Sequence, residues 1–135
     1  MLVGVGVDLV HLARLRSLCS RRTPLKLAHR ILSTQELDEY THTAHTLDQR
    51  HQFLALRWAA KEAAYKALYP TCTPSWKHLA VSKPPGSPKP QLAWATDARP
   101  SSLDSHLDHL QMHLSVSHDN DHLVAVVVVE QHPSA

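Results

Sequence analysis

The residues of this sequence best suited to chemistry lie in the stretch RWAAKEAAYKAL, residues 57–68. Glu62 follows Lys61 directly there and precedes Lys66 by four positions. The stretch is rich in Ala, Leu, Lys and Glu, which favour a helix. On a helix Glu62 and Lys66 are neighbours, because residues four apart share a face. The pair can be an exposed ion pair worth only about 0.3–0.5 kcal/mol, or part of a site that handles a metal and phosphates.

The helix that carries these residues is expected to start near Asp48 and to have two different faces. At about 100° per residue, one face is apolar and mostly small, and it contains Phe53, Leu56, Ala60, Ala63, Ala64 and Ala67. Glu62 lies almost opposite, on a face that also contains Trp58, Tyr65 and Lys66. A solvated face rarely carries two large aromatic residues. The pattern therefore favours a functional face at Glu62, and it predicts that the alanine face packs closely on another element, such as a sheet.

A second carboxylate, Asp8, follows a short apolar segment near the start of the chain. Residues 2–7 alternate apolar residues with glycine, which predicts a buried strand that ends at Asp8. The GVG sequence lacks the spacing of a dinucleotide-binding fingerprint. Its two glycines are better explained by close packing of a strand backbone. Asp8 can also cap the helix predicted over residues 9–19.

Shorter elements are predicted on either side of the long helix. Leucines at helical spacing predict a helix over residues 9–19, and another helix is expected to start near Lys26. Ser33 or Thr34, followed by Glu36, is close to a capping box and predicts a third helix. In the proline-rich segment beyond the long helix, two short strands are expected at about 78–82 and 91–95. A short helix is expected from residue 101 or 102 to about 110.

The last part of the chain predicts a β-hairpin. The sequence HLSVSHDNDHLVAVVVVE is typical of a strand, a tight turn at HDND and a second strand. Residues 123–129 are continuously apolar, whereas a strand buried on one face should alternate. This strand is therefore expected to be buried on both faces. Helices can cover one face, and the other requires a second layer or a subunit partner.

Length and composition place the chain in an ordinary class of proteins. Its 135 residues suit a single domain over residues 1–135. The two cysteines lie far apart and in no metal-binding spacing, which predicts a reduced, intracellular protein. No apolar run approaches the length of a membrane span.

Charge is more informative in its distribution than in its sum, because the net charge is only +2. Between Asp8 and Glu36 there are no acidic residues, but there are six of the 14 basic ones: Arg14, Arg16, Arg21, Arg22, Lys26 and Arg30. Such a block favours an acidic partner, although a solvated basic helix would have the same composition. The chain also has 12 histidines. Three of them, His106, His109 and His113, have helical spacing, but no Cys or acidic residue completes a zinc site there.

Three segments together resemble the holo-acyl-carrier-protein synthases, the small class of 4′-phosphopantetheinyl transferases. They are GVGVDLV with Asp8, RWAAKEAAYKAL with Glu62 and Lys66, and LSVSHD with His118. The resemblance implies an α+β fold, in which the long helix and shorter helices pack on a curved, mainly antiparallel sheet. It implies transfer of phosphopantetheine from coenzyme A to a serine of an apo acyl carrier protein, with release of adenosine 3′,5′-bisphosphate. It also implies a homotrimer with active sites at its interfaces. The carrier would belong to fatty-acid synthesis in the cytoplasm or the mitochondrial matrix.

The resemblance assigns roles to particular residues. Asp8 and Glu62 would hold Mg²⁺, which prefers carboxylate, phosphate and water oxygens, and Asp8, Glu62 and Lys66 would be the catalytic residues. Coenzyme A would contact Arg57, Lys61, Lys66 and His118. Without the resemblance, His118 would be interpreted as a core-edge histidine. The carrier would contact Arg14 and Arg30, with Arg21 and Arg22 as additions. The base that deprotonates the serine would be Glu62 or a metal-bound water that Glu62 orients.

One segment departs from the family pattern. Family members follow the Lys-Ala pair with a Gly-Thr-Gly-like loop against the nucleotide, whereas this chain has KALYPTCTP, with no glycine and with Pro70 at the turn. A protein that binds coenzyme A without turnover is therefore one alternative. A His-rich interaction protein, which would bind metal or dock on a carrier, is another. Neither a nucleic acid nor a membrane is expected as a partner.

Overall fold

The main sheet has three antiparallel strands with the C-terminal strand in its centre. The computed structural model describes residues 1–21, 23–97 and 107–133. The strands β1 (Leu2–His11), β4 (Leu110–Asp119) and β5 (His122–Gln131) lie in the order β1-β5-β4. A two-residue turn with Asn120 at a φ of 52° joins β4 to β5, so the predicted final hairpin is confirmed. A separate antiparallel pair, β2 (Leu79–Ser82) and β3 (Gln91–Trp94), matches the two predicted short strands.

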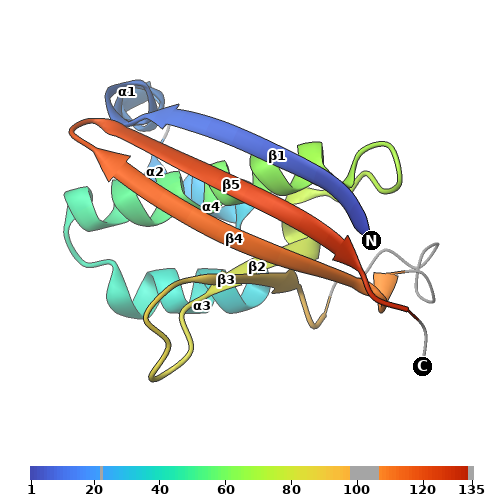
Figure 1. Cartoon of the computed structure of the whole chain (residues 1–135). Coiled ribbons are helices and arrows are strands. Elements are labelled where there is room, and N and C mark those ends of the chain that lie inside the picture. The colour runs from blue at the N-terminus through green and yellow to red at the C-terminus, as the bar shows by residue number, and fades with distance from the viewer. Residues whose placement is uncertain (22, 98–106, 134–135) are drawn as a thin grey trace.

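The helices lie on one side of this sheet (Figure 1). They are α1 (Leu12–Arg21), α2 (Pro24–Ile31), α3 (Thr34–Thr43) and α4 (Leu47–Leu68), followed by the 3₁₀ helix η1 (Trp76–His78). Ser33 and Glu36 form the predicted capping box at the start of α3, and Thr46 and Gln49 form another at the start of α4. The predicted α+β fold, with a long helix on an antiparallel sheet, is confirmed.

The glycines of β1 bring the strand directly against α4. A Cβ atom on Gly6 would lie 1.8 Å from the carbonyl oxygen of Ala63, and one on Gly4 would lie 2.0 Å from that of Ala67. No side chain fits at these distances, so the strand and the helix can approach this closely only through glycine. Both alanines are buried. The predicted close contact of the alanine face with the sheet is therefore confirmed.

Two boundaries differ from the expectations for the N-terminal region. β1 continues to His11, so Asp8 lies inside the strand rather than at its end. Because α1 begins only at Leu12, Asp8 is not its N-cap. The cause is pairing with β5, which provides partners for Leu2 and for residues 4–11.

The region around residue 110 also differs. The helix predicted to reach about residue 110 falls largely on residues 98–106, which lie outside the described residues together with His106. Leu110 already belongs to β4, and so does His113, which hydrogen-bonds Glu130 at 2.8 Å. The histidines expected at helical spacing are therefore not on one helix. Among the described residues, no group of three or more His, Cys, Asp or Glu side chains could hold a metal ion.

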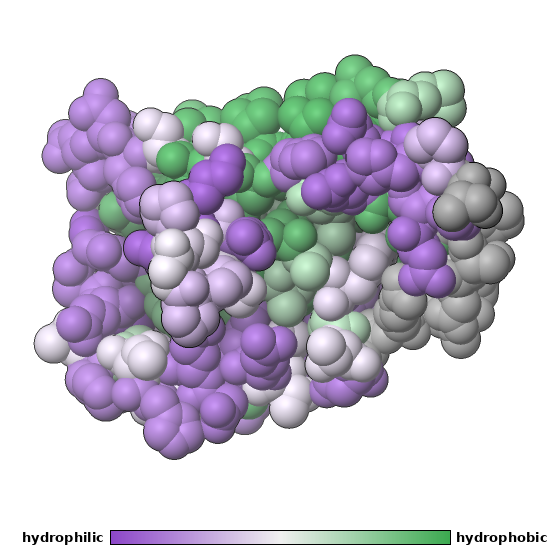
Figure 2. Space-filling view, turned by 60° about the horizontal axis from the view of Figure 1, so that its bottom comes forward, coloured by the Kyte–Doolittle hydropathy of each residue, from purple (hydrophilic) through white to green (hydrophobic). Residues whose placement is uncertain are grey.

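The apolar strand β5 is buried fully on one face only. Its residues Leu123, Ala125, Val127 and Val129 are 0–1% exposed, whereas Val124, Val126 and Val128 on the other face are only partly buried. The described residues of one chain therefore bury β5 fully on the helix side only, and burial of the other face by a subunit partner stays a prediction. The outer face continues onto β1 through Val5, Val7 and Leu9, which are 49–63% exposed. Figure 2 shows hydrophobic residues along its upper edge, where this face of the sheet comes into view.

No helix of residues 1–21, 23–97 and 107–133 has the length and hydropathy needed to cross a bilayer.

Candidate active site

Asp8 is the next residue on the inner face of β1 after the two glycines. Residues on one face of a strand are about 6.6 Å apart, and four residues of helix span about 6 Å. Each step along the inner face of β1 therefore corresponds to about one turn of α4. The step from Gly6 to Asp8 brings the carboxylate beside the turn of α4 that ends at Glu62. The side chain of Asp8 is only 16% exposed.

Lys66 lies one turn further along α4 and reaches back to β1. Its Nζ donates a hydrogen bond to the carbonyl oxygen of Val7 at 2.8 Å and lies 3.3 Å from Oδ1 of Asp8. The side chain is 51% exposed, so its ammonium group is open to a ligand as well. The structure thus brings together Asp8, Glu62 and Lys66, the three residues expected to be catalytic.

The charges of Asp8 and Lys66 both affect the pKa of Glu62. Burial and the nearby negative charge of Asp8 raise the pKa of Glu62 above its ordinary value, and the positive charge of Lys66 opposes this shift. Two carboxylates that repel each other in a partly buried position are a poor arrangement for a structure without a ligand. A bound cation would relieve the repulsion.

The donor set fits Mg²⁺. This ion commonly uses one or two protein carboxylates and takes its other oxygens from phosphates and water. Asp8 and Glu62 supply two carboxylates, and Lys66 beside them suits a phosphate group. Zinc or iron sites usually have three or more protein ligands, and no such group occurs within the described residues.

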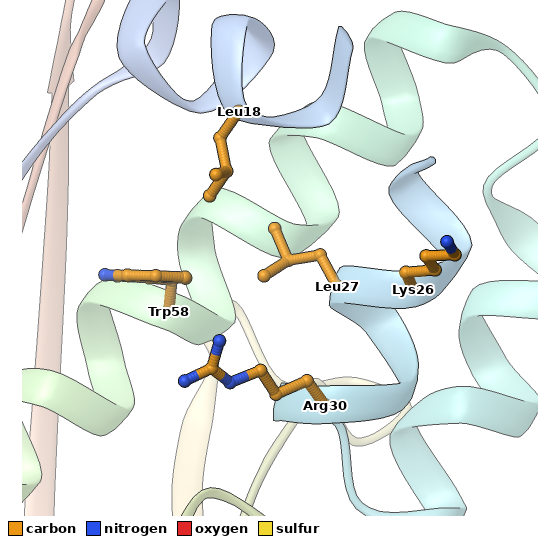
Figure 3. Close-up of a pocket in the computed structure, with 5 residues that line it drawn as sticks. All are labelled: Leu18, Lys26, Leu27, Arg30 and Trp58. Atoms are coloured by element: carbon orange, nitrogen blue, oxygen red, sulfur yellow. The ribbon is translucent and has the colours of Figure 1, made fainter. Parts of the chain in front are cut away.

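A basic pocket opens on one side of the carboxylates. It has a volume of about 500 Å³, and its lining includes Asp8, His11, Arg14, Arg21 and Trp58. A smaller pocket of about 240 Å³ shares Trp58 with it and lies between α1, α2 and α4 (Figure 3). Its lining is Leu18, Lys26, Leu27, Arg30 and Trp58, and the guanidinium of Arg30 points toward the Trp58 ring. Three of the four arginines expected to bind the carrier thus line these two pockets: Arg14 and Arg21 line the larger one, and Arg30 lines the smaller one. Arg22 lies outside the described residues.

An aromatic pocket opens from Glu62 between α4 and the segment 74–79. It has a volume of about 220 Å³ and is lined by Lys61, Glu62, Tyr65, Pro74, Ser75, Trp76 and Leu79. Trp76 contacts Trp58 with ring centroids 5.2 Å apart, so an indole pair connects the linings of the basic and aromatic pockets. The basic pocket includes Asp8, and the aromatic pocket includes Glu62.

Arg57 and Lys61 are not exposed beside the carboxylates, in contrast to the expectation that they bind coenzyme A. Lys61 is 2% exposed, and its Nζ contacts Oε1 of Glu36 and donates to the carbonyl oxygens of Ile31 at 2.6 Å and Trp76 at 2.9 Å. Arg57 is 6% exposed, and its Nε lies 3.8 Å from Oε2 of Glu36. Burial lowers the pKa of both basic groups, and the carboxylate of Glu36 opposes the shift. This geometry indicates a structural role for both residues.

Glu36 is the residue of this cluster whose role the sequence did not reveal. The capping pattern identified it as a helix cap, but it is also 1% exposed and accepts a hydrogen bond from the backbone N–H of Val81 at 2.9 Å. It thereby connects α3, α4 and β2. The available sequence feature was a pair of basic residues, Arg57 and Lys61, four positions apart on a helix with a buried face.

His118 lies near the end of β4, on the edge of the sheet opposite β1. Since β5 separates these strands, His118 is displaced sideways from Asp8 by about 10 Å. The side chain is exposed. The structure does not bring His118 into the group formed by Asp8, Glu62 and Lys66 of the same chain.

Comparison with known proteins identifies the family. Residues 4–127 match the family model of the 4′-phosphopantetheinyl transferase superfamily. The chain is 36% identical to a holo-[acyl-carrier-protein] synthase of Geobacillus kaustophilus, over 97% of this chain and 91% of that protein. It is also 36% identical to one of Hamiltonella defensa, over 96% and 98% of the two chains.

Solved structures agree. The holo-[acyl-carrier-protein] synthase of Neisseria meningitidis has a TM-score of 0.78 at 28% identity, covering 97% of this chain and all of the other. The enzyme of Bacillus anthracis, solved in complex with CoA (3′,5′-ADP), has a TM-score of 0.74 at 28% identity, covering 98% and 99%. The chain therefore belongs to the 4′-phosphopantetheinyl transferase superfamily and, within it, to the family of holo-acyl-carrier-protein synthases, which are transferases.

Proposed function

We propose that this protein transfers the 4′-phosphopantetheine group of coenzyme A to a serine of an apo acyl carrier protein, with Mg²⁺ as cofactor and adenosine 3′,5′-bisphosphate as the second product. The observation that carries the proposal is the cluster of Asp8, Glu62 and Lys66, in which Asp8 lines the basic pocket and Glu62 lines the aromatic pocket. The names of the relatives and the ligand of the B. anthracis enzyme support the same substrates.

Charge is the main obstacle to this reaction, because a pyrophosphate is split and both its halves are anionic. Asp8 and Glu62 would hold Mg²⁺, which when bound supplies charge neutralisation at the pyrophosphate. Lys66 would turn its half-exposed ammonium from the Val7 carbonyl to the phosphate oxygens. The hydrogen bond to β1 keeps Lys66 extended toward the site before substrate arrives.

Glu62 is the proposed general base. Glu62 lines the aromatic pocket and lies near Asp8, and a carboxylate positioned in a site can accept a proton from a reacting group. Glu62 would accept the proton of the carrier serine as the serine oxygen attacks phosphorus. The bond from phosphorus to the oxygen of the nucleotide phosphate breaks, and the nucleotide leaves with that oxygen.

The carrier would dock on the basic pocket. Acyl carrier proteins are acidic, as the family resemblance implies, and Arg14, Arg21 and Arg30 present positive charge from α1 and α2. All three arginines are exposed. Leu18 and Trp58 would provide the apolar contact between them (Figure 3). Asp8 lines the same pocket as Arg14 and Arg21, so a docked carrier could bring its serine to the carboxylates.

The proposed assembly is a homotrimer formed through the outer face of the sheet. Val5, Val7 and Leu9 on β1 and the outer valines of β5 form an exposed apolar surface on the described chain. Exposed apolar surfaces of this kind mark protein interfaces. In a trimer, His118 would contact the coenzyme A bound by a neighbouring subunit.

A direct test is to mix the protein with coenzyme A, Mg²⁺ and an apo acyl carrier protein and to weigh the carrier by mass spectrometry. The carrier should gain one phosphopantetheine group. Chelation of Mg²⁺ should prevent the gain, and Asp8→Ala and Glu62→Ala should each nearly abolish turnover while the protein stays folded. If the carrier mass does not change with any physiological carrier although coenzyme A binds, the protein is a coenzyme A-binding protein without turnover. Full activity in either variant would contradict the carboxylate pair.

A further inference from the structure

We infer that Tyr65 and Tyr69 form a stacking surface for the adenine of coenzyme A, in the position where this chain lacks a glycine loop. The inference deepens the proposed function and rests on it. It concerns a contact that the sequence departure at residues 69–74 left without an assignment.

The first observation is the exposure of these two rings. The chain has only seven Phe, Tyr and Trp residues. Five of them, Tyr40, Phe53, Trp58, Trp76 and Trp94, lie in the hydrophobic core or pack against it. Tyr65 is 41% exposed and Tyr69 is 62% exposed. These two tyrosines therefore differ from the other five aromatic residues, because a large part of each is accessible to a ligand.

The second observation is their mutual geometry. Tyr65 and Tyr69 are one turn apart at the end of α4, with ring centroids 6.3 Å apart and an angle of 22° between the ring planes. The two rings thus present nearly parallel faces. Aromatic faces of this kind bind nucleobases by stacking, with little dependence on hydrogen bonding.

The third observation is the position of the rings relative to the phosphates. Lys66, the proposed phosphate ligand, lies between the two tyrosines in the sequence, and Tyr65 lines the aromatic pocket that begins at Glu62. A nucleotide whose phosphates contact Lys66 therefore has an aromatic face within the reach of its base.

The geometry of phosphoryl transfer also favours binding of the nucleotide on the side of Tyr65. In phosphoryl transfer the attacking and leaving oxygens lie roughly in line, on opposite sides of phosphorus. The carrier serine would approach from the basic pocket, which contains Asp8 and the arginines. The leaving nucleotide should then extend away from that pocket, and the aromatic pocket with Tyr65 opens from the other carboxylate, Glu62.

A purely structural explanation of the tyrosine pair makes a different prediction. A pair of aromatic residues four apart stabilises a helix by only about 0.2–0.5 kcal/mol. Its removal would weaken α4 slightly and would have no selective effect on ligands that contain a base.

The test measures binding of adenosine 3′,5′-bisphosphate and of ribose 3,5-bisphosphate, which lacks the base, by calorimetry on the full chain. The double variant Tyr65→Ala/Tyr69→Ala should bind the adenosine ligand about 5- to 100-fold more weakly, as expected for loss of base stacking. It should bind the ribose ligand as the wild type does. Tyr65→Phe/Tyr69→Phe should keep the wild-type affinity, because phenyl rings stack equally well. Leu47→Ala, an exposed position at the other end of α4, is the matched control.

Two outcomes would overturn the inference while leaving the proposed function intact. In one, the wild type transfers phosphopantetheine and the alanine variant binds the adenosine ligand with unchanged affinity. In the other, the alanine variant loses affinity equally for both ligands, which would indicate a structural role. A wild-type chain that neither binds the nucleotide nor modifies a carrier would instead overturn the proposed function itself.

Discussion

Glu62 is held in a position that favours activity over stability. Its pKa is raised, first by burial and then by Asp8. The folded protein therefore binds the Glu62 proton more tightly than the unfolded chain does, and ionisation at higher pH destabilises the fold. An active site commonly contains such a conflict, because the charge that performs the chemistry has no full partner until substrate arrives.

We therefore expect Glu62→Gln to be inactive but more stable than the wild type at pH 7. The gain in the free energy of unfolding should shrink as the pH falls and vanish below about pH 4.3, the ordinary carboxyl value, where Glu62 is protonated in both states. Denaturant unfolding between pH 4 and pH 8 would measure this. Asp97→Asn, at an exposed carboxylate, is the control and should show no such gain. Equal stability of Glu62→Gln and wild type at pH 7 would show that the ionised carboxylate of Glu62 does not destabilise the fold.

The two lysines that flank Glu62 have different environments and should have separable effects. Lys61 is enclosed with Glu36, whereas Lys66 is half exposed beside Asp8. Removing one member of a buried ion pair costs about 3–5 kcal/mol. Lys61→Met should therefore lower the free energy of unfolding by about that amount and change the KM for coenzyme A far less than Lys66→Met does. Lys66→Met should leave stability nearly unchanged and reduce turnover strongly. A stable Lys61→Met with a greatly raised KM would restore the expectation that Lys61 binds coenzyme A.

At the scale of elements, the site depends on how closely β1 approaches α4. The glycines of β1 allow the strand backbone to contact the alanines of α4, and the same spacing carries Asp8 to Glu62. Gly6→Ala should lower the free energy of unfolding by at least about 1–3 kcal/mol, because its methyl group would overlap a backbone oxygen and the strand would have to move. Val5→Ala, on the outer face of the same strand, is the control and should cost less. Thermal denaturation of both variants would measure the difference, and an unaffected Gly6→Ala would contradict the packing.

The sequence predicted those elements whose evidence is local. Helix periodicity located α4, and capping residues located the start of α3. The glycines that alternate with apolar residues before Asp8 indicate close backbone packing of the first strand. The alanines of α4 indicate the same for the helix. The end of β1 could not be predicted, because its extension to His11 depends on pairing with β5, more than 100 residues away in the chain. The burial of Lys61 could not be predicted either, since its partner Glu36 is 25 residues distant and the local pattern around Glu36 accounts for it as a helix cap.

At the scale of the whole molecule, the outer sheet face suggests that a single chain is incomplete. The proposed trimer would bury this face, and its mass should be about three times the chain mass of 15.1 kDa. Val126→Asp places a charge in the middle of the apolar surface, opposite Val7, and should give folded monomers by light scattering. Gln35→Asp, on the exposed start of α3, should leave the mass unchanged. A wild-type chain that is monomeric and fully active at every concentration would contradict the assembly.

The position of His118 allows a sharper test of the same assembly. Within one chain His118 is separated from Asp8 by the width of β5, and its proposed role is at the nucleotide in the active site of a neighbouring subunit. His118→Ala and Asp8→Asn should each be nearly inactive alone. When the two variants are unfolded together and refolded as mixed trimers, roughly a quarter of the interfaces should combine an intact Asp8 from one subunit with an intact His118 from its neighbour. The transfer assay should then recover activity that neither variant has. Because two residues that act within the same chain cannot be supplied by different subunits, mixed trimers that remain inactive would place His118 in the same subunit's active site as Asp8 and would contradict a site shared between neighbours.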